Sequence, residues 1–324
     1  MTYSVGGLIQ AADYTTFQSG LNNIWSTGAG DSGWGQTALT GVSFGGVVTA
    51  TNWASLVNTL ATAGSQTTTT LTSRTAPVTG NVIAILANVS TDITSVTTRR
   101  GYATALASSI TAFTGTTSKT TSTGSGTSAW TITWTHTVTF PSAAQARYFW
   151  NAGGLVQMIM SKTSTGTDID ADWNTFVGTV GTLTMSGRVN NASQVIQGGT
   201  YTGFTRSGGS GTPAPNLSTT GWYTLTAGAA ASTMWQLNST VYPYTADFIR
   251  VTAAKDATST ILTLVTTWSQ SAQSYSTVIT GGTATTSPYS AFGTAPAVVI
   301  LPVPPSTTYL TNTWGTPTVA ASVV

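Results

Sequence analysis

Residues 130–140, Trp130-Thr-Ile-Thr-Trp-Thr-His-Thr-Val-Thr-Phe140, place threonine at every second position. Successive side chains of a β-strand point to opposite faces of the sheet. The period of two therefore predicts a strand with one packed face and one face of threonine hydroxyls. Pro141 follows directly and ends the pattern, because proline cannot donate to a strand ladder.

Short stretches of similar character continue along the chain from this strand, separated by glycine-rich or polar turns. We expect further strands at 154–161, 181–189, 221–226, 232–237, 247–253, 260–268 and 275–280. Short strands at such density are typical of an antiparallel β-sandwich or barrel. The predicted fold is therefore mainly β, an antiparallel sandwich or barrel, with a small N-terminal helical region.

Towards the N-terminus the hydrophobic period changes to that of helices. After a potential cap at Asp13, apolar residues recur three or four positions apart as far as Trp25. A second pattern begins at Thr51 or Asn52 and ends at Gly64. Residues 80–114 fit one or two further helices, the first starting at Thr91 or Asp92, but their β-branched residues also suit strands.

These patterns divide the chain into four parts. Residues 1–114 form a mixed helical and β docking region, and 115–129, nearly all Thr, Ser and Gly, form a linker or a hairpin tip. Residues 130–295 form the β body. Residues 296–324 form an extended arm, because four prolines between 296 and 305 are poorly suited to a central strand.

Charged residues are rare: they make up 6% of the 324 residues, against about 25% in an average soluble domain. None of the eight acidic residues is glutamate. Mixed surface charge normally keeps copies of a protein apart, whereas joined patches of hydroxyl and amide groups leave few charges away from water. We therefore expect a homo-oligomer in permanent contact with its neighbours; an exported surface protein is the alternative explanation of the low charge.

Several partners and compartments are disfavoured by the same composition. The ten basic residues are scattered, with one adjacent pair at Arg99-Arg100, so no basic stripe for nucleic acid is formed. The chain has no cysteine, no apolar stretch long enough to span a membrane and no secretory signal in its first twenty residues. We expect the protein to stay where it is made until it is assembled or released, with no cofactor, nucleic acid or membrane span.

Several segments of the chain carry a family resemblance, and the most similar of them is Pro141-Ser-Ala-Ala-Gln-Ala-Arg-Tyr-Phe-Trp-Asn-Ala-Gly-Gly154. Others are Asp13-Tyr14, Gly28–Gln36, Trp53–Leu56, Gly221–Leu225, Tyr242–Tyr244 and Phe248–Lys255. These segments resemble virion structural proteins of tailed bacteriophages, particularly those that infect marine cyanobacteria. The resemblance covers most of residues 10–268 and implies a virion component, in the tail, neck or fibre apparatus, made in the host cytoplasm without a signal peptide. This chain has Thr and Ser where many relatives carry charged residues.

The segment from Arg147 to Asn151 is the main candidate for an architectural or interface role. The Arg147 guanidinium can stack on a neighbouring aromatic ring or bind backbone carbonyls, and Asn151 suits a turn. It either holds an interface between subunits or ties a strand to its own domain. The candidate interface residues are Trp25, Trp34, Trp53, Arg147, Tyr148, Phe149, Trp150 and Asn151.

Sites for catalysis or metal binding have weak support. Gly30-Asp31-Ser32-Gly33 is similar to the nucleophile loop of chymotrypsin-like proteases, but the single histidine, His136, follows the serine, in the reverse order. His136 is expected to be a packed or interface residue. Asp168, Asp170 and Asp172 alternate like the first ligands of a calcium loop, yet Trp173 stands where that loop needs glycine. Asp172 more readily caps a turn at Trp173. We expect no enzyme activity.

Two functions remain open. The first is a homo-oligomeric virion building block that docks through its N-terminal region onto other virion proteins. The second is an adhesin, in which aromatic residues of segment 221–244 stack on the sugar rings of a host surface glycan.

Overall fold

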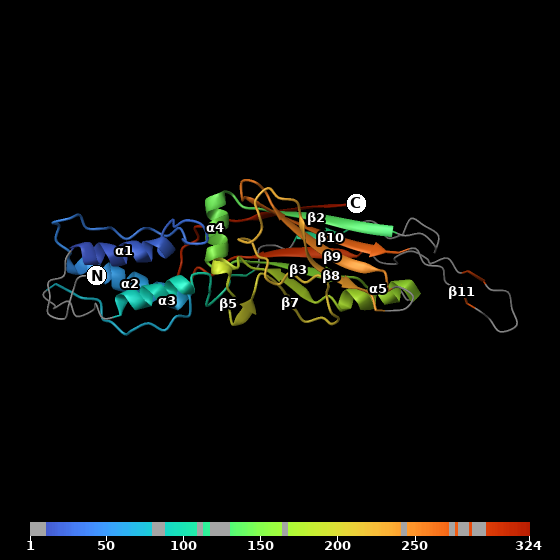
Figure 1. Cartoon of the computed structure of the whole chain (residues 1–324), viewed down its shortest axis with the longest axis horizontal. Helices are drawn as coiled ribbons and strands as arrows, with labels where there is room; N and C mark the ends of the chain where they lie inside the picture. The colour runs from blue at the N-terminus through green and yellow to red at the C-terminus, as the bar shows by residue number, and fades with distance from the viewer. Residues whose placement is uncertain are drawn as a thin grey trace.

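The protein is described by a computed structural model that covers residues 11–79, 88–108, 113–116, 130–163, 168–240, 245–271, 276–277, 285–286 and 296–324. It is elongated, with a helical end, a helix across the middle and a body of sheets (Figure 1). The helices are α1 Ala11–Trp25, α2 Ala50–Gln66, α3 Val89–Thr98, α4 Ala143–Asn151 and α5 Asp168–Gly178, with a 3-10 turn at Val189–Asn191. Among the described residues no helix is long and apolar enough to cross a membrane.

The strands form antiparallel sheets, which confirms the mainly β prediction. One sheet has the order β1-β13-β3-β4-β7 and the other β14-β2-β10-β9-β8; both are open, so no closed barrel forms in the described chain. The strands of these sheets are β1 Phe113–Thr116, β2 Trp130–Thr139, β3 Leu155–Ser161, β4 Thr182–Met185, β7 Phe204–Ser207, β8 Ser232–Asn238, β9 Phe248–Lys255, β10 Ile261–Gln270, β13 Ala297–Val303 and β14 Thr318–Val323. Two short pairs, β5 Gln194–Ile196 with β6 Gly199–Tyr201 and β11 Ser276–Thr277 with β12 Thr285–Thr286, lie outside them.

Strand β2 has the two faces that its alternation predicts. Ile132, Trp134, His136 and Val138 are buried, while the threonines between them are partly or fully exposed. The buried face meets the other sheet. The His136 ring approaches the backbone of Val298 in β13, and the Thr266 hydroxyl in β10 lies 3.4 Å from the sulfur of Met158 in β3. Side chains of both sheets and of α1–α4 belong to one continuous hydrophobic core.

The N-terminal helices form where the apolar period predicts them, with shifted ends. Helix α2 starts at Ala50 rather than at Thr51 or Asn52, because the side chains and backbone N–H groups of Thr49 and Asn52 cap each other reciprocally. It passes Gly64, which was expected to end it. A Cβ on Gly64 would lie 2.5 Å from Leu71, so this glycine permits close packing rather than a stop.

Among the described residues of 88–116 there is one helix, α3, which starts at Val89, before the expected Thr91 or Asp92. Residues 99–108 form a turn and two bridges, at Ala103 and Leu106, and 113–116 form strand β1, so the alternative of a second helix is absent from these residues. Gly115 and Thr116, expected in the linker, lie in β1. Residues 117–129 lie outside the described chain.

Two other sequence predictions were wrong. Segment 221–226 is not a strand: the N–H groups of Thr224 and Leu225 bond back to the Gly221 carbonyl, and the resulting turn buries Trp222. Asp172 does not cap a turn, because it lies inside α5. Of the expected strand 275–280, only 276–277 is described.

The expected C-terminal arm instead contributes a central strand, β13, which pairs with β1 and β3 of the same chain. Pro302 and Pro304 are tolerated here because their backbone groups point away from β3. The Pro304 carbonyl accepts from the Ala107 N–H, on the side away from β3, and Pro302, two residues earlier, faces the same way. Strand β1 pairs only as far as Ile300, so neither proline has to donate to a neighbouring strand.

Candidate structural junction

The helical end meets the sheet body at the glycine-rich loop that follows α1. Gly33 has a φ of +96°, and a Cβ there would lie 2.4 Å from the Thr27 carbonyl oxygen. Gly35 has a φ of +73° and leaves room for the ring of Tyr148 in α4. Only glycine satisfies both the backbone angle and the close approach at these positions. The loop is therefore shaped to receive α4 of the body.

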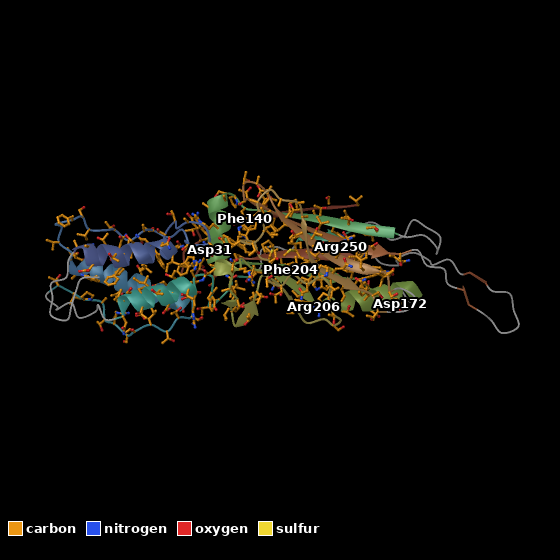
Figure 2. The ribbon with its side chains drawn as sticks, in the orientation of Figure 1. Asp31, Phe140, Asp172, Phe204, Arg206 and Arg250 are labelled. Atoms are coloured by element: carbon orange, nitrogen blue, oxygen red, sulfur yellow. The ribbon has the colours of Figure 1, made fainter. Side chains whose placement is uncertain are left out.

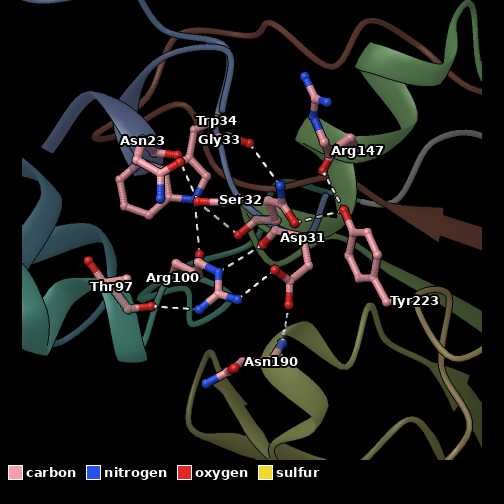
Figure 3. A network of polar contacts seen from close by, with 11 residues as sticks. Asn23, Asp31, Ser32, Gly33, Trp34, Thr97, Arg100, Arg147, Asn190 and Tyr223 are labelled. Carbon is pink, nitrogen blue, oxygen red and sulfur yellow. Dashed lines mark hydrogen bonds and ion pairs between the residues drawn. The ribbon is translucent and has the colours of Figure 1, made fainter. Parts of the chain in front are cut away.

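Trp34 fills the centre of this loop and is fully buried. Its indole Nε1–H donates to the Arg100 carbonyl at 2.9 Å and to the Asn151 carbonyl at 3.1 Å. The Arg100 carbonyl lies after α3, as Figure 3 shows. The Asn151 carbonyl lies at the end of α4. One side chain thus connects three segments that are distant in sequence.

An ion pair connects the same loop to α3. The Arg100 guanidinium donates to the Asp31 carboxylate at 2.6 Å and to the Asp31 carbonyl at 2.9 Å, and its third nitrogen donates to the Thr97 carbonyl. The second carboxylate oxygen of Asp31 accepts the backbone N–H of Asn190 in the body. Figure 2 shows Asp31 at the boundary between the two parts.

Asn151, which is fully buried, is bonded on both sides. Its Nδ2 donates to the Gly33 carbonyl at 2.9 Å, and its Oδ1 accepts the Tyr223 hydroxyl at 2.7 Å. Burial, and secondarily the Asp31 carboxylate, raises the pKa of Tyr223 well above its usual value, so this hydroxyl remains a donor. We call Asp31, Trp34, Arg100, Asn151 and Tyr223 the junction.

Neighbouring contacts extend the junction to α4 and to the C-terminal segment. Arg147 donates to the Thr27 carbonyl at 2.6 Å, and its guanidinium carbon lies 5.2 Å from the centre of the Tyr148 ring. The side chain of Gln36 exchanges bonds with the backbone of Thr311, and Thr313 donates to the Trp34 carbonyl. The loop is therefore held both by α4 and by the C-terminal segment.

The candidate interface residues mainly make contacts within this chain. Trp53 is buried in the helical end against Tyr14, with ring centres 5.3 Å apart, and Trp25 is half-buried against Trp34. Phe149 and Trp150 are buried in α4, where Trp150 stacks on Trp222. The candidate residues from the sequence included Trp34 and Asn151 of the junction, but not Asp31, Arg100 or Tyr223. The low number of charged residues could have pointed to Arg100, because in a chain with so few ionised side chains each of them is expected to have a structural role.

The fold does not bring the remaining candidate catalytic and metal-binding residues together. The Ser32 hydroxyl donates to the Asn23 carbonyl at 2.7 Å, while His136 lies between the sheets, where burial lowers its pKa to about 4. Asp168, Asp170 and Asp172 all lie on helical backbone, not on the extended backbone that would give them a shared face. Among the described residues, no three potential ligands gather around a metal position. Asp172 borders a shallow pocket with Asp247, near the opposite end of the molecule (Figure 2).

The far end of the helical part carries exposed apolar residues. Segment 37–42 runs back along α1, since carbonyls of Thr37, Leu39, Thr40 and Val42 accept side chains of α1. Loop 43–48 then turns towards α2. Phe44 and Val47 in this loop are 103% and 81% exposed. Large apolar side chains at this level of exposure gain free energy when a partner covers them.

The chain matches no protein-family model, no curated protein and no solved structure.

Proposed function

We propose that the protein is a homo-oligomeric structural component of a tailed-phage virion, within the tail, neck or fibre apparatus. Its two sheets serve as the layers of a sandwich body, and its helical end docks onto another virion protein. The observation that carries this proposal is the exposed loop 43–48 at the end of a part that the junction holds rigidly to the body.

The helical end and the sheet body are continuous with each other. The helical end and both sheets share one core, and buried hydrogen bonds cross the boundary between them. A load applied at the helical end is therefore transmitted to the sheets without a hinge at the junction. Such a part suits a particle that must keep its shape.

The surface chemistry points in the same direction. The solvent face of β2 consists of threonines, and residues facing outward on β10 include Thr263, Thr267 and Ser269. Arg250 of β9, opposite Thr267, is a charged residue on this outward face. Contact between two such faces removes few ions from water, so the desolvation cost of assembly is small. The resemblance of segment 141–154 to phage virion proteins supports a particle as the setting.

Substitution of the docking loop tests this proposal. Phe44→Ser combined with Val47→Ser removes two exposed apolar side chains and leaves the core intact. We expect unchanged melting temperature and an at least tenfold loss of incorporation into particles, measured by quantitative mass spectrometry of purified virions. Ile159→Thr is the matched control, because Ile159 is an exposed apolar residue on β3 of the body. Normal incorporation of the loop variant contradicts docking through this end.

The adhesin alternative gains no specific support from the rings described in segment 221–244. Trp222 and Trp235 are buried, and the Tyr223 hydroxyl is bonded within the junction. Buried rings offer no platform for a sugar. Tyr242 and Tyr244, the remaining rings of that segment, lie outside the described residues.

A further inference from the structure

Strand β14 forms one edge of its sheet and pairs only with β2 among the described strands (Figure 1). Val324 and Thr133 exchange both backbone hydrogen bonds, at 2.9 and 3.0 Å. Hydrogen-bonded and non-hydrogen-bonded pairs alternate along an antiparallel ladder. The N–H and C=O groups of Val319, Ala321 and Val323 therefore point away from β2. Strand β1 of the facing sheet comes near β14 but pairs with β13.

Burial along β14 shows the same missing neighbour. Residues 134, 136 and 138 of β2, on the core face, are fully buried, whereas their partners Val323, Ala321 and Val319 are half-buried. The three residues face the same core, and among the described strands they pair on one side only, with β2. A strand added beyond β14 would bury their outer side further.

The other sheet edges carry features that oppose pairing, and β14 carries none. The outer side of β8 is occupied by residues 214–217, which bond to Gln236 and Met234, and β8 contains a bulge. Strand β7 has four residues and carries Arg206, and β1 has four residues. Strand β14, Thr-Val-Ala-Ala-Ser-Val, has six residues without proline, charge or bulge. Proteins usually protect edges with such features.

We propose that β14 pairs antiparallel with β14 of a second copy, about a two-fold axis at Ala321. This inference deepens the proposed homo-oligomeric building block and rests on it. The sequence of β14 is self-complementary in this register: Val319 lies opposite Val323 of the other copy, and Ala321 lies opposite its own counterpart. All three positions point their N–H and C=O groups outward, so about six backbone hydrogen bonds form.

The pairing adds side-chain contacts on both faces. On the core face, two valine–valine pairs flank an alanine pair on the axis, and pairs of β-branched residues are favourable across strands. On the solvent face, the small residues Ala320 and Ser322 lie opposite each other without repulsion. The two β14-containing sheets then form one continuous sheet across the dimer.

Single cysteines test the register directly, because the chain has no cysteine of its own. In Ala321→Cys the two Cα atoms lie about 5.5 Å apart across the axis, which is within disulfide range. In the control, Ala320→Cys, the two cysteines are diagonal neighbours about 7–8 Å apart. We expect mild oxidation to link Ala321→Cys into dimers at least tenfold faster than Ala320→Cys, measured on non-reducing gels.

A backbone variant tests the edge without a cross-link. Ala321→Pro removes an N–H that β2 does not use, so the fold is retained, whereas Ala321→Ser keeps that N–H and serves as control. We expect Ala321→Pro alone to weaken self-association at least tenfold in analytical ultracentrifugation, with an unchanged far-ultraviolet circular dichroism spectrum.

The outcomes separate this inference from the proposed function. If the unmodified chain assembles but Ala321→Cys links no faster than Ala320→Cys, the pairing of β14 is overturned and the building block stands. If the unmodified chain stays monomeric at high concentration and Ala321→Cys does not link, both the pairing and the homo-oligomer are overturned.

Discussion

Strand β2 and the junction are held together by opposite means. In β2, backbone groups bond to the two neighbouring strands, and the alternating sequence decides which side chains are buried. At the junction, the side chains of Trp34, Arg100 and Asn151 bond to backbone carbonyls of distant loops. The loss of one side chain in β2 leaves the many backbone hydrogen bonds of the strand in place. At the junction, by contrast, each hydrogen bond depends on one particular side chain. Single substitutions should therefore destabilise the junction more than the sheet.

The largest expected effect comes from Trp34→Ala, which breaks the junction at its centre. The change leaves a cavity and two carbonyls without their donor, so we expect a loss of about 4 kcal/mol in unfolding free energy. Hydrogen exchange should increase in α1 and α2 before it does in β2 and β10. Trp25→Ala, at a half-buried ring bonded to the Thr37 carbonyl, is the control with a smaller loss. If hydrogen exchange increases equally in the helices and in the sheet, the junction does not stabilise the helical end separately from the sheet.

The stability of the packing between the two sheets should depend on pH through His136, the only histidine of the chain. Burial between the sheets lowers its pKa to about 4, below its value of about 6.5 in the unfolded chain. The unfolded state alone therefore takes up this proton between about pH 6.5 and 4, and stability falls across that window by up to about 3 kcal/mol.

Urea unfolding at several pH values measures the slope. His136→Leu is neutral in both states, so its stability should stay nearly constant from about pH 6.5 to 4.5. An equal slope in both proteins rules out His136 as its origin.

Arg100→Met should cost about 2 kcal/mol, less than the loss of Trp34. The Asp31 carboxylate loses its cation but keeps the Asn190 N–H and is partly exposed, so water replaces some of the lost interaction. A double-mutant cycle with Asp31→Asn measures the coupling, which we expect to exceed that of an exposed pair, about 0.2–1 kcal/mol. Additive effects mean that the ion pair between the loop and α3 does not stabilise the junction.

Tyr223→Phe gives the smallest expected change, about 1–2 kcal/mol. The hydroxyl disappears and leaves the buried Oδ1 of Asn151 without its donor, while the ring stays in place. Chemical denaturation measures the loss. Tyr148→Phe is the control, because among the described residues the Tyr148 hydroxyl makes no hydrogen bond, and its loss should stay below about 0.5 kcal/mol.

Prediction from sequence succeeded where one period dominated. The alternation of residues 130–140 gave strand β2 and its buried face, and the apolar spacing from Tyr14 gave α1. It failed at 221–226 and in the C-terminal segment. In both, the residue types suited one local structure, but bonds to distant backbone, at Ser186 for Trp222 and at Ala107 for Pro304, decided another. Such bonds leave no periodic signal.

The amino-acid sequence alone determined the mainly β character, the two N-terminal helices and a surface with few charges, because these follow from local periodicity and composition. The tertiary structure decided that Asp31 meets Arg100, that Trp34, Trp53, Phe149 and Trp150 lie in the core, and that β14 is the edge of its sheet among the described strands. The reason is physical. Periodicity specifies which face of an element is buried, but the partner of that face is selected by the packing of segments that are distant in sequence.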